Sequence, residues 1–168
     1  MAMPILPVAV FGTIACMVAG CGSGEIASQT SGVVSSAVSS QTSPQGVTVA
    51  VRDVVPVGQI LVDGTGRTLY AFEADRPDEA TCDGACAQVW PPYRISATPR
   101  PGDSGVTKAA MLGAVTRADG TRQLTYGGHP MYYFVGDEGP GVANGHGRRE
   151  FDSRWLVVGI DGNMIEPR

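Results

Sequence analysis

The sequence lacks the motifs that identify most enzymes. It has no Gly-x-Ser-x-Gly elbow, no phosphate-binding glycine loop, no dinucleotide fingerprint and no His-Glu-x-x-His helix. With 16 acidic residues some carboxylate pair is always available on paper, so Glu73, Asp75 and Asp137 are no evidence of hydrolysis. We therefore expect no catalytic residues and no cofactor.

Strong charge and long apolar stretches are absent as well. The net charge of −4 is too mild to indicate a nucleic-acid surface, so we expect no nucleic-acid partner. The first 20 residues carry no charged side chain, and their apolar run extends only from Ile5 to Val18. Because a helix needs about 18 apolar residues or more to cross a bilayer, this run is too short for a transmembrane helix.

The apolar run leads into Val18-Ala19-Gly20-Cys21, which is the pattern of a lipobox. An exported precursor of this kind is acylated on the cysteine, with fatty acids such as palmitate, and cleaved just before it. Two or three acyl chains hold a protein stably on a membrane, since each buried CH₂ contributes about 0.8 kcal/mol. We predict a signal peptide over residues 1–20, lipidation of Cys21, and a location on the extracytoplasmic face of the cell membrane. A simply secreted protein is the alternative.

Residues 21–46 have the composition of a flexible tether between the lipid and a folded domain. Serine, threonine and glycine dominate this segment, and Glu25 is its one charged residue. Such a segment cannot bury enough apolar surface to offset the entropy that ordering would cost. We expect the folded domain to occupy residues 47–168.

The presumed domain repeats itself. Residues 66–75 read Gly-Arg-Thr-Leu-Tyr-Ala-Phe-Glu-Ala-Asp, and residues 128–137 read Gly-His-Pro-Met-Tyr-Tyr-Phe-Val-Gly-Asp. Two copies at this long spacing indicate an internal duplication within one pseudo-symmetric domain rather than a solenoid. The shared motif positions are Tyr70, Phe72 and Asp75 in the first copy and Tyr132, Phe134 and Asp137 in the second.

Around each copy the local signals are those of β-hairpins, in which short apolar runs flank Asp-Gly or Gly-Gly turns. Helical periodicity is weak, with short candidates only at Asp83–Val89 and Val106–Leu112. We predict a mainly β domain of antiparallel hairpins with one or two short helices. The expected strands are Ile60–Val62, Thr68–Phe72, Ala114–Arg117, Gln123–Tyr126, Met131–Val135, Trp155–Ile160 and Asn163–Ile165.

The six motif positions have a structural and a functional interpretation. Because side chains alternate along a strand, the tyrosine and the phenylalanine of each copy point to the same face. Two such pairs would meet in a core, while the aspartates would accept hydrogen bonds from turn N–H groups or from a buried tyrosine hydroxyl. The alternative is a ligand or metal site built from the same tyrosines and carboxylates.

Further motifs accompany the two copies. Cys82-x-x-x-Cys86-Ala precedes Trp90-Pro91-Pro92, and Tyr126-x-Gly-His-Pro-Met-Tyr-Tyr-Phe includes the second copy. Together these motifs resemble a bacterial family of secreted-repeat lipoproteins, described by a Tyr-x-(Phe/Trp/Tyr)-x-x-Asp motif. The resemblance covers roughly residues 57–165. It implies an envelope location and a two-repeat domain, and it carries over no catalytic residue, substrate or cofactor.

Cysteine chemistry in the mature chain is limited to Cys82 and Cys86, since Cys16 leaves with the signal peptide and Cys21 takes the lipid. Outside the cytoplasm two cysteines four residues apart most often form a disulfide. We predict a structural disulfide. A redox-active pair and a metal site are the alternatives.

Both histidines of the chain, His129 and His146, would complete a Cys₂His₂ set with the two cysteines. Met131 lies two residues from His129 and is a soft ligand of the kind that copper takes. Both ideas require distant segments to converge, so we predict no metal site. A hydrogen-bonding role for His129 and a surface-loop position for His146 are the simpler expectations.

These observations predict a membrane-anchored lipoprotein of the cell envelope. Its two-repeat domain is expected to bind or scaffold an unidentified envelope protein or wall component without catalysis. The alternative is an extracytoplasmic redox or metal-handling protein that uses Cys82 and Cys86.

Overall fold

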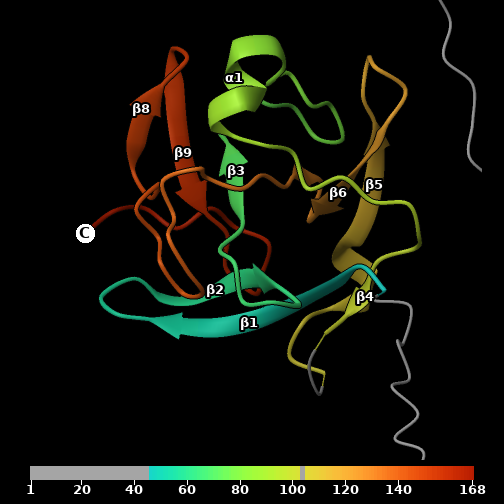
Figure 1. Cartoon of the computed structure of the whole chain (residues 1–168). Coiled ribbons are helices and arrows are strands. Elements are labelled where there is room, and N and C mark those ends of the chain that lie inside the picture. The colour runs from blue at the N-terminus through green and yellow to red at the C-terminus, as the bar shows by residue number, and fades with distance from the viewer. Residues whose placement is uncertain (1–45, 103–104) are drawn as a thin grey trace, which may run out of the picture. The chain divides into compact units, whose positions relative to one another are not determined.

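The computed structural model describes residues 46–102 and 105–168. The predicted signal peptide, Cys21 and nearly all of the predicted tether lie outside the described residues. Within the described part the elements are β1 (Thr48–Val54), β2 (Gly58–Asp63), β3 (Tyr70–Phe72), α1 (Gly84–Val89), β4 (Arg100–Pro101), a 3₁₀ helix (Ala109–Met111), β5 (Leu112–Thr116), β6 (Arg122–Tyr126), β7 (His129–Pro130), β8 (Arg148–Glu150) and β9 (Ser153–Val157) (Figure 1).

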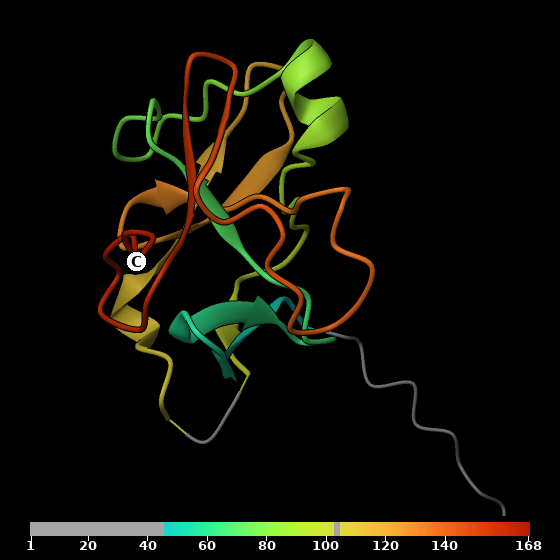
Figure 2. The same cartoon turned by 90° about the vertical axis from the view of Figure 1, so that its left-hand side faces the viewer.

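The described strands form three small sheets. Their orders are β2-β1-β4, β3-β9-β8 and β5-β6-β7. Neighbouring strands run antiparallel except β1 and β4, which are parallel. The prediction of a mainly β domain of antiparallel hairpins is confirmed, and α1 lies at one end of the strands in both views (Figures 1 and 2).

Backbone hydrogen bonds join each repeat to the C-terminal end of the other repeat. The N–H of Leu61 in β2 donates to Val158 O at 2.9 Å, and the N–H of Leu124 in β6 donates to Tyr93 O at 2.9 Å. β3 likewise pairs with β9, which is 80 residues or more away along the chain. The two copies therefore share their strands, so neither could keep its hydrogen bonds without the other.

Three local predictions differ from the structure. The predicted strand Asn163–Ile165 is reduced to an isolated bridge between Met164 and Val158, because β9 already ends at Val157. Met131–Val135 forms no continuous strand, because Tyr132 faces Pro91-Pro92, and prolines have no N–H to extend a ladder. The predicted helix over Val106–Leu112 shrinks to the 3₁₀ turn Ala109–Met111, because Leu112 already begins β5. By contrast α1 runs from Gly84 to Val89, close to its predicted bounds.

The interior contains two clusters of buried side chains. The larger aromatic cluster holds both tryptophans, the disulfide cysteines and the tyrosine and phenylalanine of each motif copy. The second cluster is mainly aliphatic and includes Leu61 and Leu124 together with Tyr126 and Met131. Each cluster contains residues from both copies, so neither copy has a core of its own.

Candidate functional site

The two motif tyrosines meet at the centre of the domain. Tyr70 N donates to Tyr132 O at 2.9 Å, and Tyr132 N donates to Tyr70 O at 2.9 Å. Both residues are completely buried. Since they occupy the same motif position, this reciprocal pair marks a pseudo-twofold axis between the copies.

The tyrosine hydroxyls cross that axis. Tyr70 donates to Asp137 Oδ2 at 2.7 Å, and Tyr132 donates to Asp75 Oδ2 at 2.7 Å. Each tyrosine therefore bonds the aspartate of the other copy rather than its own. A single copy of the motif would therefore lack the carboxylate that its tyrosine binds.

The remaining oxygen of each carboxylate is bonded to backbone in a following loop. Asp75 Oδ1 accepts from Thr81 N at 2.8 Å and from Thr81 Oγ1 at 2.6 Å. Asp137 Oδ1 accepts from Asn144 N at 2.9 Å, and Gly145 N donates to the Tyr70 hydroxyl at 3.3 Å. The aspartates thus tie the loops after the two motif copies to the tyrosine centre.

Four aromatic rings stack beside the tyrosines. Trp90 and Trp155 lie 4.0 Å apart and nearly parallel, with an interplanar angle of 3°. Phe72 stacks on the outer face of Trp155 at 4.3 Å, and Phe134 stacks on the outer face of Trp90 at 4.4 Å. Each phenylalanine therefore packs on the tryptophan from the other repeat, as the tyrosines do with the aspartates.

The tyrosines also pack their edges against this stack. Tyr70 meets Trp90 at 5.4 Å and Tyr132 meets Trp155 at 5.2 Å, both close to perpendicular. Edge-to-face pairs of this kind add about 0.5–1.5 kcal/mol beyond the area that they bury. We name these eight residues the reciprocal centre: Tyr70, Phe72, Asp75, Trp90, Tyr132, Phe134, Asp137 and Trp155.

Burial dominates the electrostatics of the reciprocal centre. It raises the pKa of Tyr70 and of Tyr132 well above the ordinary value, and the neighbouring carboxylates raise it further. Burial also raises the pKa of Asp75 and Asp137, against the lowering effect of the hydrogen bonds that they accept. At neutral pH the tyrosines therefore stay protonated and act as hydrogen-bond donors.

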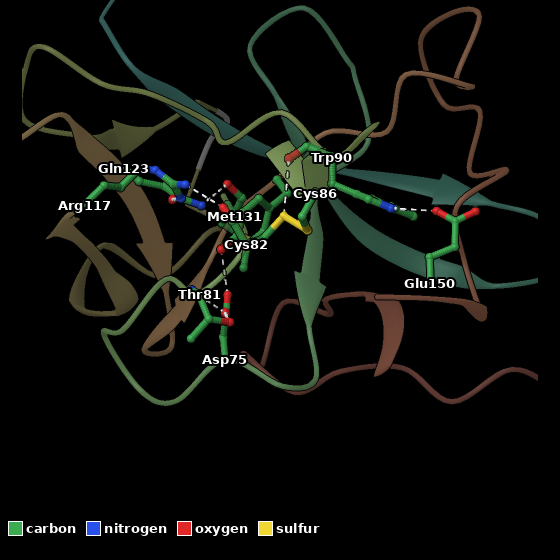
Figure 3. The surroundings of a disulfide bond; sticks show 10 residues. Asp75, Thr81, Cys82, Cys86, Trp90, Arg117, Gln123, Met131 and Glu150 are labelled. Carbon is green, nitrogen blue, oxygen red and sulfur yellow. Dashed lines mark hydrogen bonds between the residues drawn. A yellow bond between two sulfur atoms is a disulfide. The ribbon is translucent and has the colours of Figure 1, made fainter. Parts of the chain in front are cut away.

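Cys82 and Cys86 form a disulfide, as predicted (Figure 3). Their Cα atoms are 5.3 Å apart, which lies within the usual range for such bonds. Cys82 precedes α1, and its side chain is 1% exposed, while Cys86 within α1 is 8% exposed. The two sulfurs belong to the aromatic cluster, beneath the surface of the domain.

A buried arginine lies beside the disulfide (Figure 3). Arg117 Nη1 donates to Gln123 Oε1 at 2.6 Å, and Arg117 Nη2 donates to Cys82 O. Gln123 Nε2 donates in turn to Met131 O at 2.8 Å. This chain joins the disulfide loop of the first copy to the start of the second motif copy. Sequence reasoning did not find it, because a buried charge leaves no periodic signal.

The residues of the hypothetical metal sets do not converge in the structure. Cys82 and Cys86 are bonded to each other, and His146 accepts only a long contact from Val157 N at 3.5 Å. Burial lowers the pKa of both His129 and His146. Across residues 46–102 and 105–168 no group of three or more His, Cys, Asp or Glu side chains is placed to hold a metal ion.

The tryptophans are the main members of the centre that sequence reasoning did not identify. They are the two tryptophans of the chain, and each follows a motif tyrosine, by 20 residues for Trp90 and by 23 for Trp155. This similar spacing after each motif tyrosine is the sequence signal that could have identified the tryptophans as equivalent residues of the two repeats. The centre is closed rather than open, since its donors and acceptors bond one another and its rings fill the space between them. Trp155 Nε1 is an exception, because this buried donor has no hydrogen-bond partner in the part of the chain that the structure describes.

Comparison with known families agrees with this geometry. A family model described as a secreted repeat of unknown function matches residues 52–93 and residues 113–159, which together make up more than half of the chain. Each matched segment contains one copy of the Tyr-x-Phe-x-x-Asp motif. The chain therefore belongs to this family of secreted repeats, as its motifs predicted. No curated protein and no solved structure matches it.

The family description agrees with a location outside the cytoplasm, which also suits a disulfide. No helix of the described residues is both long and apolar enough to cross a bilayer. Lipidation of Cys21 falls outside those residues and stays a prediction.

Proposed function

We propose, with membership of the secreted-repeat family as the premise, that this protein is a lipid-anchored module of the cell envelope that binds or scaffolds a partner without catalysis. The lipobox at Val18–Cys21 supports the anchor, and the serine-rich segment after it supports a tethered domain. The partner is an envelope protein or a wall component.

One observation carries the non-catalytic part of the proposal. The tyrosines, aspartates and tryptophans that both repeats share contact one another at the reciprocal centre, through hydrogen bonds and ring stacking. A catalytic group must reach its substrate, whereas Tyr70, Tyr132, Trp90 and Trp155 are fully buried. The duplicated residues therefore stabilise the fold, and a partner would be recognised by residues on the surface of the domain.

Fatty-acid labelling tests the anchor. Cells expressing the full chain are grown with a labelled fatty acid, and the protein is followed through membrane and soluble fractions. The wild type should take up label and stay with the membranes, whereas Cys21→Ser should be unlabelled and released. An unlabelled wild-type protein would overturn the anchored function.

Photo-cross-linking in living cells tests binding. Val55 and Val135 have side chains 93% and 57% exposed, so either position accepts a photoreactive residue without disturbing the core. The proposal expects a discrete adduct with one envelope component from at least one position. The unsubstituted chain and unirradiated cells are the controls, since neither can form an adduct. Failure of both exposed positions would count against a binding module.

The redox or metal-handling role is the second candidate, because the structure does contain the disulfide on which a redox role would depend. Thiol titration and metal analysis of the purified full chain decide between the two. A disulfide that mild reductant opens readily, or a stoichiometric bound metal, would favour this second candidate.

A further inference from the structure

The loop after the second motif copy contains the single Asn-Gly pair of the chain, Asn144-Gly145. Asparagine followed by glycine is the dipeptide most prone to deamidation, because glycine has no side chain to shield the backbone nitrogen that attacks the asparagine amide. Asn144 is exposed, whereas Gly145 is buried. The pair therefore combines a reactive amide at the surface with a nucleophile inside the domain.

Packing leaves no alternative to glycine at position 145. A Cβ atom at this position would lie 2.7 Å from Cη2 of Trp90 and 3.0 Å from Cε1 of Tyr70. Both rings are completely buried, and they pack against each other in the reciprocal centre. Neither ring can move aside without disturbing the stack, so a larger residue that would slow deamidation is excluded.

Asparagine at position 144 is likewise required by its contacts. Asn144 Nδ2 donates to Gly136 O at 3.0 Å, which joins the two ends of the loop. An aspartate would offer only acceptor atoms to that carbonyl. Its charge would also lie beside Asp137, whose Oδ1 accepts from Asn144 N at 2.9 Å. The loop therefore depends on the amide that deamidation removes.

Native hydrogen bonds hold the two reacting groups apart. Gly145 N, the nucleophile, donates to the Tyr70 hydroxyl at 3.3 Å. The Asn144 amide, the electrophile, is bonded to Gly136 O at the start of the loop. Attack of Gly145 N on Asn144 Cγ requires both bonds to open. Protection therefore depends on the Tyr70 hydroxyl, which itself donates to Asp137 Oδ2 at 2.7 Å.

We propose that Asn144-Gly145 is a deamidation site that the reciprocal centre protects, so that the chain is modified when its second repeat opens. Gly145 N bonds to Asn144 Cγ, the Cγ–Nδ2 bond breaks, and the proton of the attacking nitrogen leaves with the amide as ammonia. Water then opens the resulting succinimide to aspartate or isoaspartate. The reaction consumes water and releases ammonia, and it needs no oxidant, reductant or cofactor.

Either product prevents the loop from closing as before. The new carboxylate at position 144 cannot donate to Gly136 O, and it repels the Asp137 carboxylate. Isoaspartate also adds a methylene to the backbone, which displaces Gly145 from its place against the Trp90 and Tyr70 rings. Because the ammonia is lost, the change persists after the loop closes again. The site therefore records in the covalent structure that the second repeat has opened.

The first repeat has no such pair at the equivalent place. Thr81 N bonds Asp75 as Asn144 N bonds Asp137, but the residue after Thr81 is Cys82, which the disulfide holds to α1. A covalent bond thus secures the first loop and not the second, so local opening is expected in the second. The inference goes beyond the proposed function, because it needs neither the lipid anchor nor a partner.

Peptide mass spectrometry of the purified full chain tests the proposal. The protein is incubated in mildly alkaline buffer, with and without enough urea to unfold it, and is then digested with trypsin. Asn144 lies in the peptide of residues 123–148, and Asn163, which precedes a bulky methionine, lies in the peptide of residues 155–168 as an internal control. We expect deamidation of Asn144 to be at least about tenfold slower in the folded chain, with Asn163 unchanged in both.

Tyr70→Phe and Tyr132→Phe are a matched pair of variants. Each removes one hydroxyl that bonds an aspartate of the reciprocal centre, but Gly145 N donates to the Tyr70 hydroxyl and not to that of Tyr132. In the folded chain Tyr70→Phe should therefore raise the rate at Asn144 at least about tenfold, and Tyr132→Phe less than about threefold. Urea melts establish beforehand that both variants are folded in the incubation buffer.

Three results would overturn the proposal. Equal rates in the folded and the unfolded wild type would mean that the fold does not protect the pair, and this comparison needs no variant. Absence of product from the unfolded chain would mean that the pair is not a modification site. Equal acceleration by Tyr70→Phe and Tyr132→Phe would mean that overall stability, and not the Tyr70 hydroxyl, controls the reaction.

Discussion

The two repeats are most alike where they face each other and most different where they face outward. At the reciprocal centre the main contacts of one repeat have counterparts in the other, from the Tyr70–Asp137 and Tyr132–Asp75 bonds to the outer phenylalanines of the ring stack. Contacts across a pseudo-twofold axis must suit both copies at once, so a change in one copy disturbs both. Divergence is therefore restricted near the axis.

The repeats have nevertheless diverged in four ways. Only the first carries a disulfide, and only the second buries an arginine, where Arg117 bonds Gln123. The Trp90 indole donates to Glu150 Oε2 at 2.8 Å, whereas the indole N–H of Trp155 has no hydrogen-bond partner among the described residues. The fourth difference is the sheet edge, because β4 pairs with the start of β1 in the first repeat, whereas no described strand pairs with the outer edge of β5 in the second. The shared contacts of the reciprocal centre therefore hold the two repeats together, and the remaining features distinguish one repeat from the other.

Replacing the phenylalanines is the severest test of the symmetric centre. Phe72→Ala and Phe134→Ala each remove a buried ring from one end of the stack, and such changes typically cost about 3–5 kcal/mol. Because the contact distances are nearly the same, we expect similar losses of unfolding free energy. Urea melts of the two variants measure them. A loss below about 1 kcal/mol at either position would mean that the ring is not a core element.

Removing the hydroxyls sharpens the comparison. Tyr70→Phe and Tyr132→Phe each delete a hydrogen bond to a carboxylate, which is worth about 1.5–3 kcal/mol. The Tyr70 hydroxyl also accepts from Gly145 N, so Tyr70→Phe should cost more than Tyr132→Phe. Urea melts check the order. The opposite order would show that the Gly145 contact contributes nothing.

Much of this centre could be predicted from the sequence, because the duplicated motif predicted buried aromatic pairs with aspartates at their ends. The sequence could not predict that each tyrosine bonds the aspartate of the other copy. Tyr70 could bond either Asp75 or Asp137 as far as spacing is concerned, and only the three-dimensional approach of the repeats decides. The Asp-Gly turns marked the hairpins for the same local reason that Gly127 and Gly162 adopt positive φ.

Long-range features account for the rest. β4 is two residues long and parallel to β1, so it has neither an alternating pattern nor a turn signal. The tryptophan stack joins residues 65 positions apart, and no local pattern reports such a contact. The loss of the predicted strand over Met131–Val135 depends on the prolines at positions 91 and 92, which lie in the partner segment and not in the strand itself.

Removing the disulfide tests a difference between the repeats. Cys82 follows Thr81, whose N–H binds Asp75, just as Gly145 follows Asn144, whose N–H binds Asp137, so the second repeat has glycine at the equivalent place. The double variant Cys82→Ala/Cys86→Ala should lose about 2 kcal/mol, the low value that so short a loop implies.

Reductant provides the control for that measurement. Reducing the wild type should lower its stability by a similar amount, while the double variant should be insensitive to reductant. If the wild type melts identically with its disulfide open and closed, the bond is not structural.

The smallest effect is a pH dependence that both aspartates should share. Burial raises the pKa of Asp75 and of Asp137 above the ordinary value of 3.8, so the folded state binds protons more tightly than the unfolded state does. The stability that this contributes is full below the ordinary value and is lost as the pH rises through the raised values. Asparagine mimics the protonated carboxyl, so the cost of Asp75→Asn or Asp137→Asn should shrink as the pH rises from the ordinary range toward neutrality. Urea melts of wild type and variants across that range give the difference directly, free of the surface carboxylates that all of them share. A cost that grows with pH at either position would mean that hydrogen bonding outweighs burial there, and that the two halves of the centre differ in their electrostatics.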